Sequence, residues 1–214
     1  MIIRLACIAA GYLFGLFQTA YFYGKMKGID IRTVGSGNAG STNALRAFGT
    51  KAGITVFAGD CLKCVIVVLL VRRILGRFYP DLGFLLSVYA AVGCILGHNF
   101  PFYLGFRGGK GIASTAGLIL TFPWQMVIVG LVSFFGPVIL THYVSLGSLL
   151  AITTFIIGAV LMGQTGRLPV AGTARIELYI LVLLIAALAF YQHRENIKRL
   201  LNGTERKTYL FKKN

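Results

Sequence analysis

The chain has 214 residues, of which 57% are hydrophobic and 13% charged, and its formal net charge is +15. Apolar runs of membrane-spanning length recur along most of it, which excludes a soluble globular domain and predicts an all-α, polytopic membrane protein. Because no aromatic–basic pattern typical of RNA binding accompanies the charge, we expect anionic lipid headgroups and phosphorylated substrates as partners, and no nucleic acid.

The first predicted span covers residues 3–24. This apolar run is too long for the core of a signal peptide and lacks a small-x-small cleavage site. We therefore interpret it as a retained membrane helix.

A polar, glycine-rich loop follows, with the sequence GSGNAGSTNALR over residues 35–46. Glycines let backbone N–H groups converge on an oxyanion, and Arg46 ends the stretch with a planar fork suited to phosphate. The sequence therefore predicts a phosphate site, with a flexible polar connector as the alternative. The candidate residues are Ser36, Gly37, Asn38, Gly40, Asn43 and Arg46.

The second predicted span, residues 52–71, contains two opposite charges, Asp60 and Lys63. Intramembrane charges are costly and usually paired, and their i, i+3 spacing lets these two pair with each other, so we assign them a structural role. The four cysteines lie in apolar spans, and we interpret them as small buried hydrophobic residues. No metal site is expected.

The third predicted span, residues 82–97, leads into a second polar cluster, GHNFPFYLGFRGGKG at 97–111. Its Gly-Gly-Lys-Gly end precedes a helix start, where free N–H groups and a Lys side chain can meet an anion. The spacing is not that of a P-loop. A juxtamembrane turn with a snorkelling lysine is the alternative. The candidates here are His98, Gly108, Gly109 and Lys110.

The fourth apolar run, residues 112–140, would form a helix about 43 Å long, well beyond a ~30 Å hydrocarbon core. The sequence Phe122-Pro123-Trp124 breaks it into a short helix, which is either a full crossing or re-entrant, and a longer return helix. With spans at 146–163 and 176–191, the total is about seven transmembrane helices. Ser145 opens the first of these two spans, as a helix N-cap or as a site residue.

The tail from residue 192 is basic. On a helix leaving the membrane, His193 and Asn196 share one face, so both could reach a site under the bilayer. The alternative is an amphipathic basic helix lying on lipid.

Seven crossings place the termini on opposite sides. The segments sharing the C-terminal side, namely 25–51, 98–110, 142–145 and the tail, hold five, two, none and seven Lys or Arg residues, against six on the other side. The positive-inside rule therefore predicts an outside N-terminus and a cytoplasmic C-terminus. All the glycine-rich loops then face the cytoplasm.

The three polar motifs, with HRENIKRLLNGTE at 193–205 as the third, resemble those of the bacterial PlsY family over nearly the whole chain. The resemblance implies a single acyltransferase domain over residues 1–214, located in the bacterial inner membrane. It would transfer an acyl chain from acyl phosphate to glycerol-3-phosphate without a metal, nucleotide or other cofactor. It implies catalytic roles for Ser36, Arg46, Lys110, His193 and Asn196, substrate contacts by the other motif residues, and a structural role for Glu195. Ser145, outside the three motifs, is expected to donate a hydrogen bond to phosphate or to the developing oxyanion. Contact with the enzyme that makes acyl phosphate is a further expectation.

Acyl phosphate is already activated, and no G-x-S-x-G elbow is visible, so we expect direct attack by the acceptor hydroxyl. Two other classes remain to be weighed against this enzyme. An anion or phosphorylated-solute transporter would be expected to show symmetric repeats, which are not detectable. A scaffold that binds anionic lipid would explain the basic tail but not the two glycine-rich loops.

Overall fold

The structure is a computed structural model that describes residues 1–209. Within that range all regular elements are helical, as expected. The α-helices are α1 (Ile2–Gly15), α2 (Thr19–Met26), α3 (Ser41–Phe48), α4 (Thr50–Phe78), α5 (Gly83–Asn99), α6 (Ile112–Leu120), α7 (Trp124–Thr141), α8 (Val144–Gln164), α9 (Gly172–Gln192) and α10 (Arg194–Leu201). Two short 3-10 helices are η1 (Ile31–Thr33) and η2 (Phe102–Leu104).

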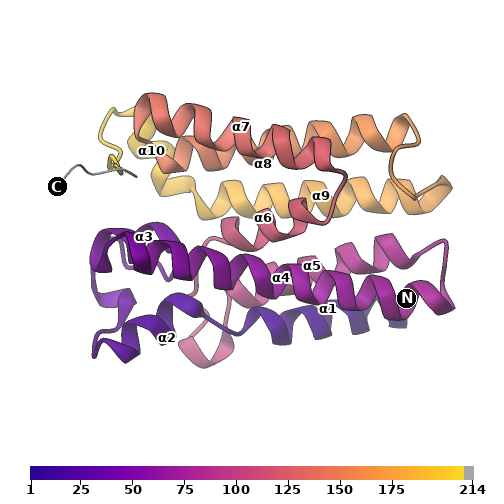
Figure 1. Cartoon of the computed structure of the whole chain (residues 1–214), viewed down its shortest axis with the longest axis horizontal. Helices are drawn as coiled ribbons and strands as arrows, with labels where there is room; N and C mark the ends of the chain where they lie inside the picture. The colour runs from indigo at the N-terminus through magenta and orange to yellow at the C-terminus, as the bar shows by residue number, and fades with distance from the viewer. Residues whose placement is uncertain (210–214) are drawn as a thin grey trace.

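The long helices run side by side along the long axis of the molecule (Figure 1). In residues 1–209, six segments are long and apolar enough to cross a membrane: Ile2–Met26, Thr50–Phe78, Gly83–Leu104, Trp124–Thr141, Val144–Gln164 and Gly172–Gln192. The expected break at residues 121–123 is present, but α6 has nine residues and rises only about 13 Å. It therefore forms a short helix that packs mainly against α4 instead of a seventh full-length span.

The N-terminus and the last described residues, up to 209, lie at opposite ends of the helix bundle (Figure 1). Helices α3 and α10 lie at the end away from the N-terminus. The chain runs away from this end through α6 and returns to it through α7 (Figure 1). Although α6 is short, α8 therefore starts at the same end as α6.

The first span differs from the continuous helix that was predicted, because it is interrupted between α1 and α2. Gln18 is fully buried at the break, and its Nε2 donates to the carbonyls of Gly97 and His98 at 3.3 and 3.0 Å. The interruption frees the carbonyl of Phe17, which accepts a hydrogen bond from Lys63 Nζ at 2.6 Å. A polar side chain thus satisfies backbone groups that an unbroken helix would have satisfied itself.

Helices α1 and α5 pack with their backbones in close contact. Gly11 and Gly15 of α1 face Gly93 and Gly97 of α5, and a Cβ at any of the four would overlap the backbone of the other helix. Two small-xxx-small sequences therefore form the interface, which is typical of membrane helix pairs. This close packing holds His98, the residue after Gly97, beside the break in the first span.

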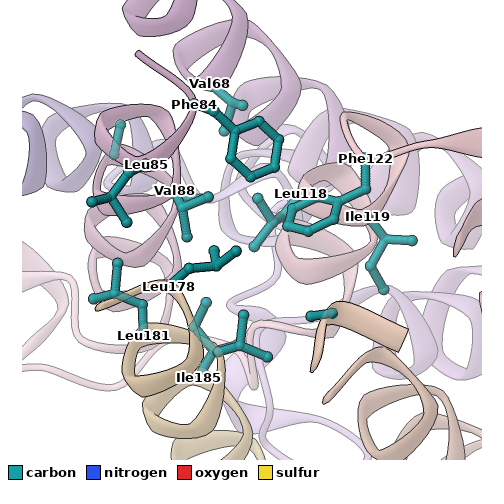
Figure 2. Close-up of a cluster of buried hydrophobic side chains, with 14 of the residues drawn as sticks. Val68, Phe84, Leu85, Val88, Leu118, Ile119, Phe122, Leu178, Leu181 and Ile185 are labelled. Carbon is teal, nitrogen blue, oxygen red and sulfur yellow. The ribbon is translucent and has the colours of Figure 1, made fainter. Parts of the chain in front are cut away.

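Buried apolar side chains from α4, α5, α6 and α9 fill the centre of the bundle, as Figure 2 shows. Phe122 lies between Phe84 and Phe155, with ring centroids 5.2 Å from each and edge-to-face geometry. The turn between α6 and α7 is thereby anchored in the core, which explains why α6 ends short of the far side.

Candidate active site

One cavity of about 430 Å³ lies at the end of the bundle that carries α3 and α10. It is within the range usual for small-molecule sites. All three sequence motifs contribute to its wall. Of the expected site residues, the following line it: Ser36, Gly37, Asn38, Gly40, Asn43, Arg46, Asp60, His98, Lys110, Ser145, His193, Glu195 and Asn196. Gly108, Gly109 and Lys63 lie outside the lining.

Asn43 stabilises the first glycine-rich loop. Its Oδ1 accepts from the backbone N–H of Ser36 at 2.8 Å, and its Nδ2 donates to the carbonyls of Ile31 and Val34. The side chain is 1% exposed. Gly35 has φ +62, and a Cβ there would overlap Asn43 Oδ1. Asn43 was expected to bind phosphate; here its polar atoms shape the loop that places Ser36 at the cavity.

Arg46 lies at the rim of the cavity, where its guanidinium contacts the C-terminal segment. Its Nε donates to Thr208 Oγ1 at 3.1 Å and its Nη2 to the carbonyl of Arg206 at 3.1 Å. Partial burial lowers the pKa of Arg46, but the group remains a cation at neutral pH. Since these acceptors are neutral, the charge of Arg46 stays available to an anion.

Glu205 lines the cavity and was not among the residues predicted from the sequence. Its Oε1 accepts from Ser145 Oγ at 3.0 Å and from Asn196 Nδ2 at 2.7 Å, and its Oε2 accepts from Arg199 Nε at 2.8 Å. Burial opposes ionisation, but the hydrogen bonds from Asn196, Arg199 and Ser145 outweigh it and hold the pKa of Glu205 below its usual value. The available signal was an acid at the end of the third motif, within a strongly basic tail.

Two expectations change because of Glu205. The structural role given to Glu195 belongs to Glu205, since the Glu195 side chain is 58% exposed and pairs only with Arg194 and Lys198 among the described residues. Ser145 makes no N-cap hydrogen bond to α8 and instead donates to Glu205. The tail does not simply lie on lipid either, because Glu205 and Arg206 line the cavity.

Lys110 and His193 have shifted pKa values that suit them to opposite tasks. Burial, with Arg199 and Arg46 nearby, lowers the pKa of Lys110 to about 8, and its Nζ contacts Asn196 Oδ1. Burial and the charge of Lys110 lower the pKa of His193 to about 4. At pH 7 Lys110 therefore carries a positive charge while His193 is neutral and able to accept a proton.

Asp60, Lys63 and His98 form a buried cluster below the cavity. The predicted Asp60–Lys63 pair is present, with Nζ 2.9 Å from Oδ1. Lys63 Nζ also lies 2.9 Å from His98 Nδ1, and Thr19 Oγ1 donates to Asp60 Oδ1 at 3.0 Å. Direct pairing and hydrogen bonds offset the free-energy cost of burying these charges within the bilayer.

The glycines at 108 and 109 were expected to offer backbone N–H groups to phosphate. Instead, these groups donate to the carbonyls of Asn99 and His98, both at 3.1 Å. A Cβ at Gly108 would overlap the His98 carbonyl, and one at Gly109 would overlap His98 Nε2. Their smallness therefore allows the second motif to pack tightly against His98.

Replacing Gly109 with alanine is expected to lower kcat/KM by at least about tenfold, with both kcat and KM affected, because the new methyl group displaces the His98 ring. Steady-state kinetics on purified protein measures this. Gly136→Ala is the matched control, because a Cβ there has no neighbour within 4 Å. An effect confined to KM for the acceptor would instead favour direct approach of Gly109 to the substrate.

The comparison with known sequences decides the family. The sequence model of the family described as glycerol-3-phosphate acyltransferase matches residues 5–203 of this chain. The chain is 44% identical over 201 residues to a glycerol-3-phosphate acyltransferase of Clostridioides difficile strain 630, covering 92% of this chain and 91% of that one. This chain belongs to the glycerol-3-phosphate acyltransferase family. A relative from Thermoanaerobacter sp. strain X514 with the same description is 41% identical over 198 residues, with the same coverages.

The fold agrees with this assignment. The chain is similar to the crystal structure of PlsY (YgiH), an integral membrane glycerol 3-phosphate acyltransferase, in its glycerol 3-phosphate form, with a TM-score of 0.83, 30% identity and 96% of both chains covered. For the lysophosphatidic acid form the TM-score is 0.80 at 29% identity, covering 97% and 96%. The resemblance to the PlsY family is confirmed, and the acyltransferase is favoured over the transporter and the scaffold.

Proposed function

We propose that this acyltransferase transfers an acyl chain from acyl phosphate to the sn-1 hydroxyl of glycerol-3-phosphate, giving lysophosphatidic acid and phosphate. The observation that carries the proposal is the mixed lining of one cavity. Arg46, Lys110 and Arg199 supply positive charge, while Phe57 and Phe134 supply an apolar wall. A donor with a phosphate head and an acyl tail suits both parts.

The proposed reaction is a direct displacement. The acceptor hydroxyl oxygen bonds to the acyl carbon, the bond from that carbon to the phosphate oxygen breaks, and phosphate leaves with the electron pair. The hydroxyl proton passes to a base. His193 Nδ1 lies 2.8 Å from the carbonyl of Ala189, which can only accept, so Nδ1 carries the hydrogen and Nε2 is free as an acceptor. Arg46 and Lys110 hold two mutually repelling anions together.

The proposal is tested by supplying purified protein in lipid with acyl phosphate and labelled glycerol-3-phosphate. We expect labelled lysophosphatidic acid and one phosphate released per acyl chain transferred. Acyl thioesters with the same chain form the comparison arm. Product formation only with a thioester would disprove the proposed donor while leaving the acyltransferase assignment intact.

Direct attack predicts that no acyl-enzyme accumulates when acyl phosphate is supplied alone. Ser36 is the exposed hydroxyl at the cavity and the residue to examine, because mixed anhydrides acylate serine readily. Mass spectrometry of rapidly quenched protein makes the measurement, with Ser36→Ala as the control. An adduct on Ser36 that transfers to added glycerol-3-phosphate at the rate of turnover would replace direct attack with a covalent route.

We further propose that the protein lies in the bacterial inner membrane with the cavity facing the cytoplasm, in contact with lipid and with the enzyme that supplies acyl phosphate. Single cysteines at Ser36, Arg107 and Asn202 should then label from the cytoplasmic side, and those at Arg77 and Gly166 from outside. The four native cysteines are buried, so a variant lacking them is a suitable background. Labelling of Ser36 from outside would reverse the proposed orientation.

A further inference from the structure

The buried Asp60–Lys63–His98 cluster has a geometry that a simple ion pair does not require. Lys63 Nζ lies 2.6 Å from the carbonyl oxygen of Phe17, 2.9 Å from Asp60 Oδ1 and 2.9 Å from His98 Nδ1. An ammonium group has three hydrogens to donate and cannot accept. The three nearest acceptors therefore match its three donors, with the carbonyl of Gly15 farther away at 3.3 Å, and His98 Nδ1 is one of those three.

This contact determines which ring nitrogen of His98 carries hydrogen. A protonated Nδ1 would place two donors against each other, and an imidazolium would add a second positive charge 2.9 Å from the ammonium. The ring is therefore neutral with its hydrogen on Nε2. We infer that Lys63, held by Asp60 and Phe17, fixes His98 in this tautomer so that Nε2–H donates a hydrogen bond to a substrate oxygen in the cavity.

The surroundings of Nε2 support a ligand-facing donor. His98 lines the cavity, and Nε2 has no hydrogen-bond partner among residues 1–209. The ring packs against Gly109, where a Cβ would overlap Nε2, so the absence of a side chain at Gly109 leaves the ring room in this position. The substrate oxygen belongs either to a phosphoryl group or to the acyl carbonyl, where negative charge develops during transfer.

The second histidine of the cavity has the opposite arrangement. The carbonyl of Ala189 holds the hydrogen of His193 on Nδ1, leaving the lone pair on Nε2. The two rings thus differ in function: His98 donates and His193 accepts. Asp60 and Lys63 become positioning residues that act through His98, which goes beyond the structural role assigned to them from the sequence. This inference rests on the proposed use of the cavity for glycerol-3-phosphate and acyl transfer.

The tautomer can be measured without any donor substrate. Protein labelled with [15N]histidine contains three histidines, and the His98 signal is assigned by its loss in His98→Gln. We expect hydrogen on Nε2 and none on Nδ1. In Lys63→Met the hydrogen should move to Nδ1, because Asp60 Oδ1, 3.6 Å away, becomes the nearest acceptor. Hydrogen on Nδ1 in the unsubstituted protein would overturn the inference.

Two substitutions of His98 test its function as a donor. Glutamine can place an amide N–H near the position of Nε2, whereas asparagine reaches only the region of Nδ1. We expect His98→Gln to stay within about tenfold of the original kcat/KM and His98→Asn to lose more than about 100-fold. Equal losses in both variants would contradict the donor role. Both His98 variants retain Lys63. The comparison between them is therefore valid even if Lys63→Met fails to fold.

The kinetic pattern of His98→Asn identifies the substrate oxygen. A rise in KM for glycerol-3-phosphate, with weaker inhibition by inorganic phosphate, assigns Nε2–H to a phosphoryl oxygen. A fall in kcat at unchanged KM assigns it to the acyl carbonyl. Failure of the original enzyme to use acyl phosphate would disprove the proposed donor but would leave the measured tautomer unaffected.

Discussion

Replacing Arg46 with alanine is expected to lower kcat/KM by about 30- to 1000-fold, which corresponds to about 2–4 kcal/mol of lost transition-state stabilisation. In the described residues the guanidinium has neutral acceptors, the hydroxyl of Thr208 and the carbonyl of Arg206, so its charge is free to hold a phosphate. Arg46→Lys should also lose most activity, because a point charge cannot reproduce a bidentate fork.

The control for Arg46 must separate substrate binding from attachment of the C-terminal segment. Thr208→Val removes the hydroxyl contacts and leaves the guanidinium intact. We expect this variant to keep activity within about tenfold, since it removes two part-buried hydrogen bonds, each contributing about 0.5–1.5 kcal/mol, and leaves the charge of Arg46 in place. If Thr208→Val lost as much activity as Arg46→Ala, the function of Arg46 would be to hold the tail.

Replacing Lys110 with alanine is expected to cause a loss of similar size, because Lys110 provides a partly buried positive charge in the second motif. Its contact with Asn196 links the second motif to the third. Removing the ammonium group would leave less positive charge to offset the negative charges of Glu205 and an incoming phosphate. Purified Lys110→Ala protein should remain folded but turn over poorly at saturating substrate. Near-normal turnover would remove Lys110 from the proposed site.

The pH dependence gives an independent test of Lys110. Because its pKa is lowered to about 8, the free enzyme carries the ammonium below pH 8 and loses it as the pH rises through 8. KM for glycerol-3-phosphate should therefore rise above about pH 8. Lys110→Arg keeps its charge throughout this range and should show no such rise, even where its activity is lower. A flat profile for the lysine enzyme would contradict the prediction.

Much of the architecture follows from local sequence properties. Long apolar runs predicted the spans, and Phe122-Pro123-Trp124 predicted the break that separates α6 from α7. Glycine, asparagine and arginine clusters identified the three segments that line one cavity. The sequences Gly11-x-x-x-Gly15 and Gly93-x-x-x-Gly97 carried a further signal, since small residues four apart permit the close approach of α1 and α5.

Other features depend on which groups meet in space. Hydropathy could not show that α1 ends before Gln18, because the carbonyls released there are satisfied by Gln18 and Lys63 from outside the helix. Spacing paired Asp60 with Lys63, but His98 joins them from α5, through the packing of three helices. Glu205 is ten residues from Glu195, and only the fold shows which carboxylate is buried.

The sequence by itself determined the membrane class, the family and the segments that line the cavity, because hydropathy, glycine content and motif order are properties of neighbouring residues. The tertiary structure decided how individual atoms are used. The N–H groups of Gly108 and Gly109 are occupied by backbone carbonyls, and Nδ1 of His98 faces an ammonium group whereas Nδ1 of His193 faces a carbonyl. A hydrogen bond depends on distance and direction between groups far apart in the chain, and these are fixed only when the helices pack.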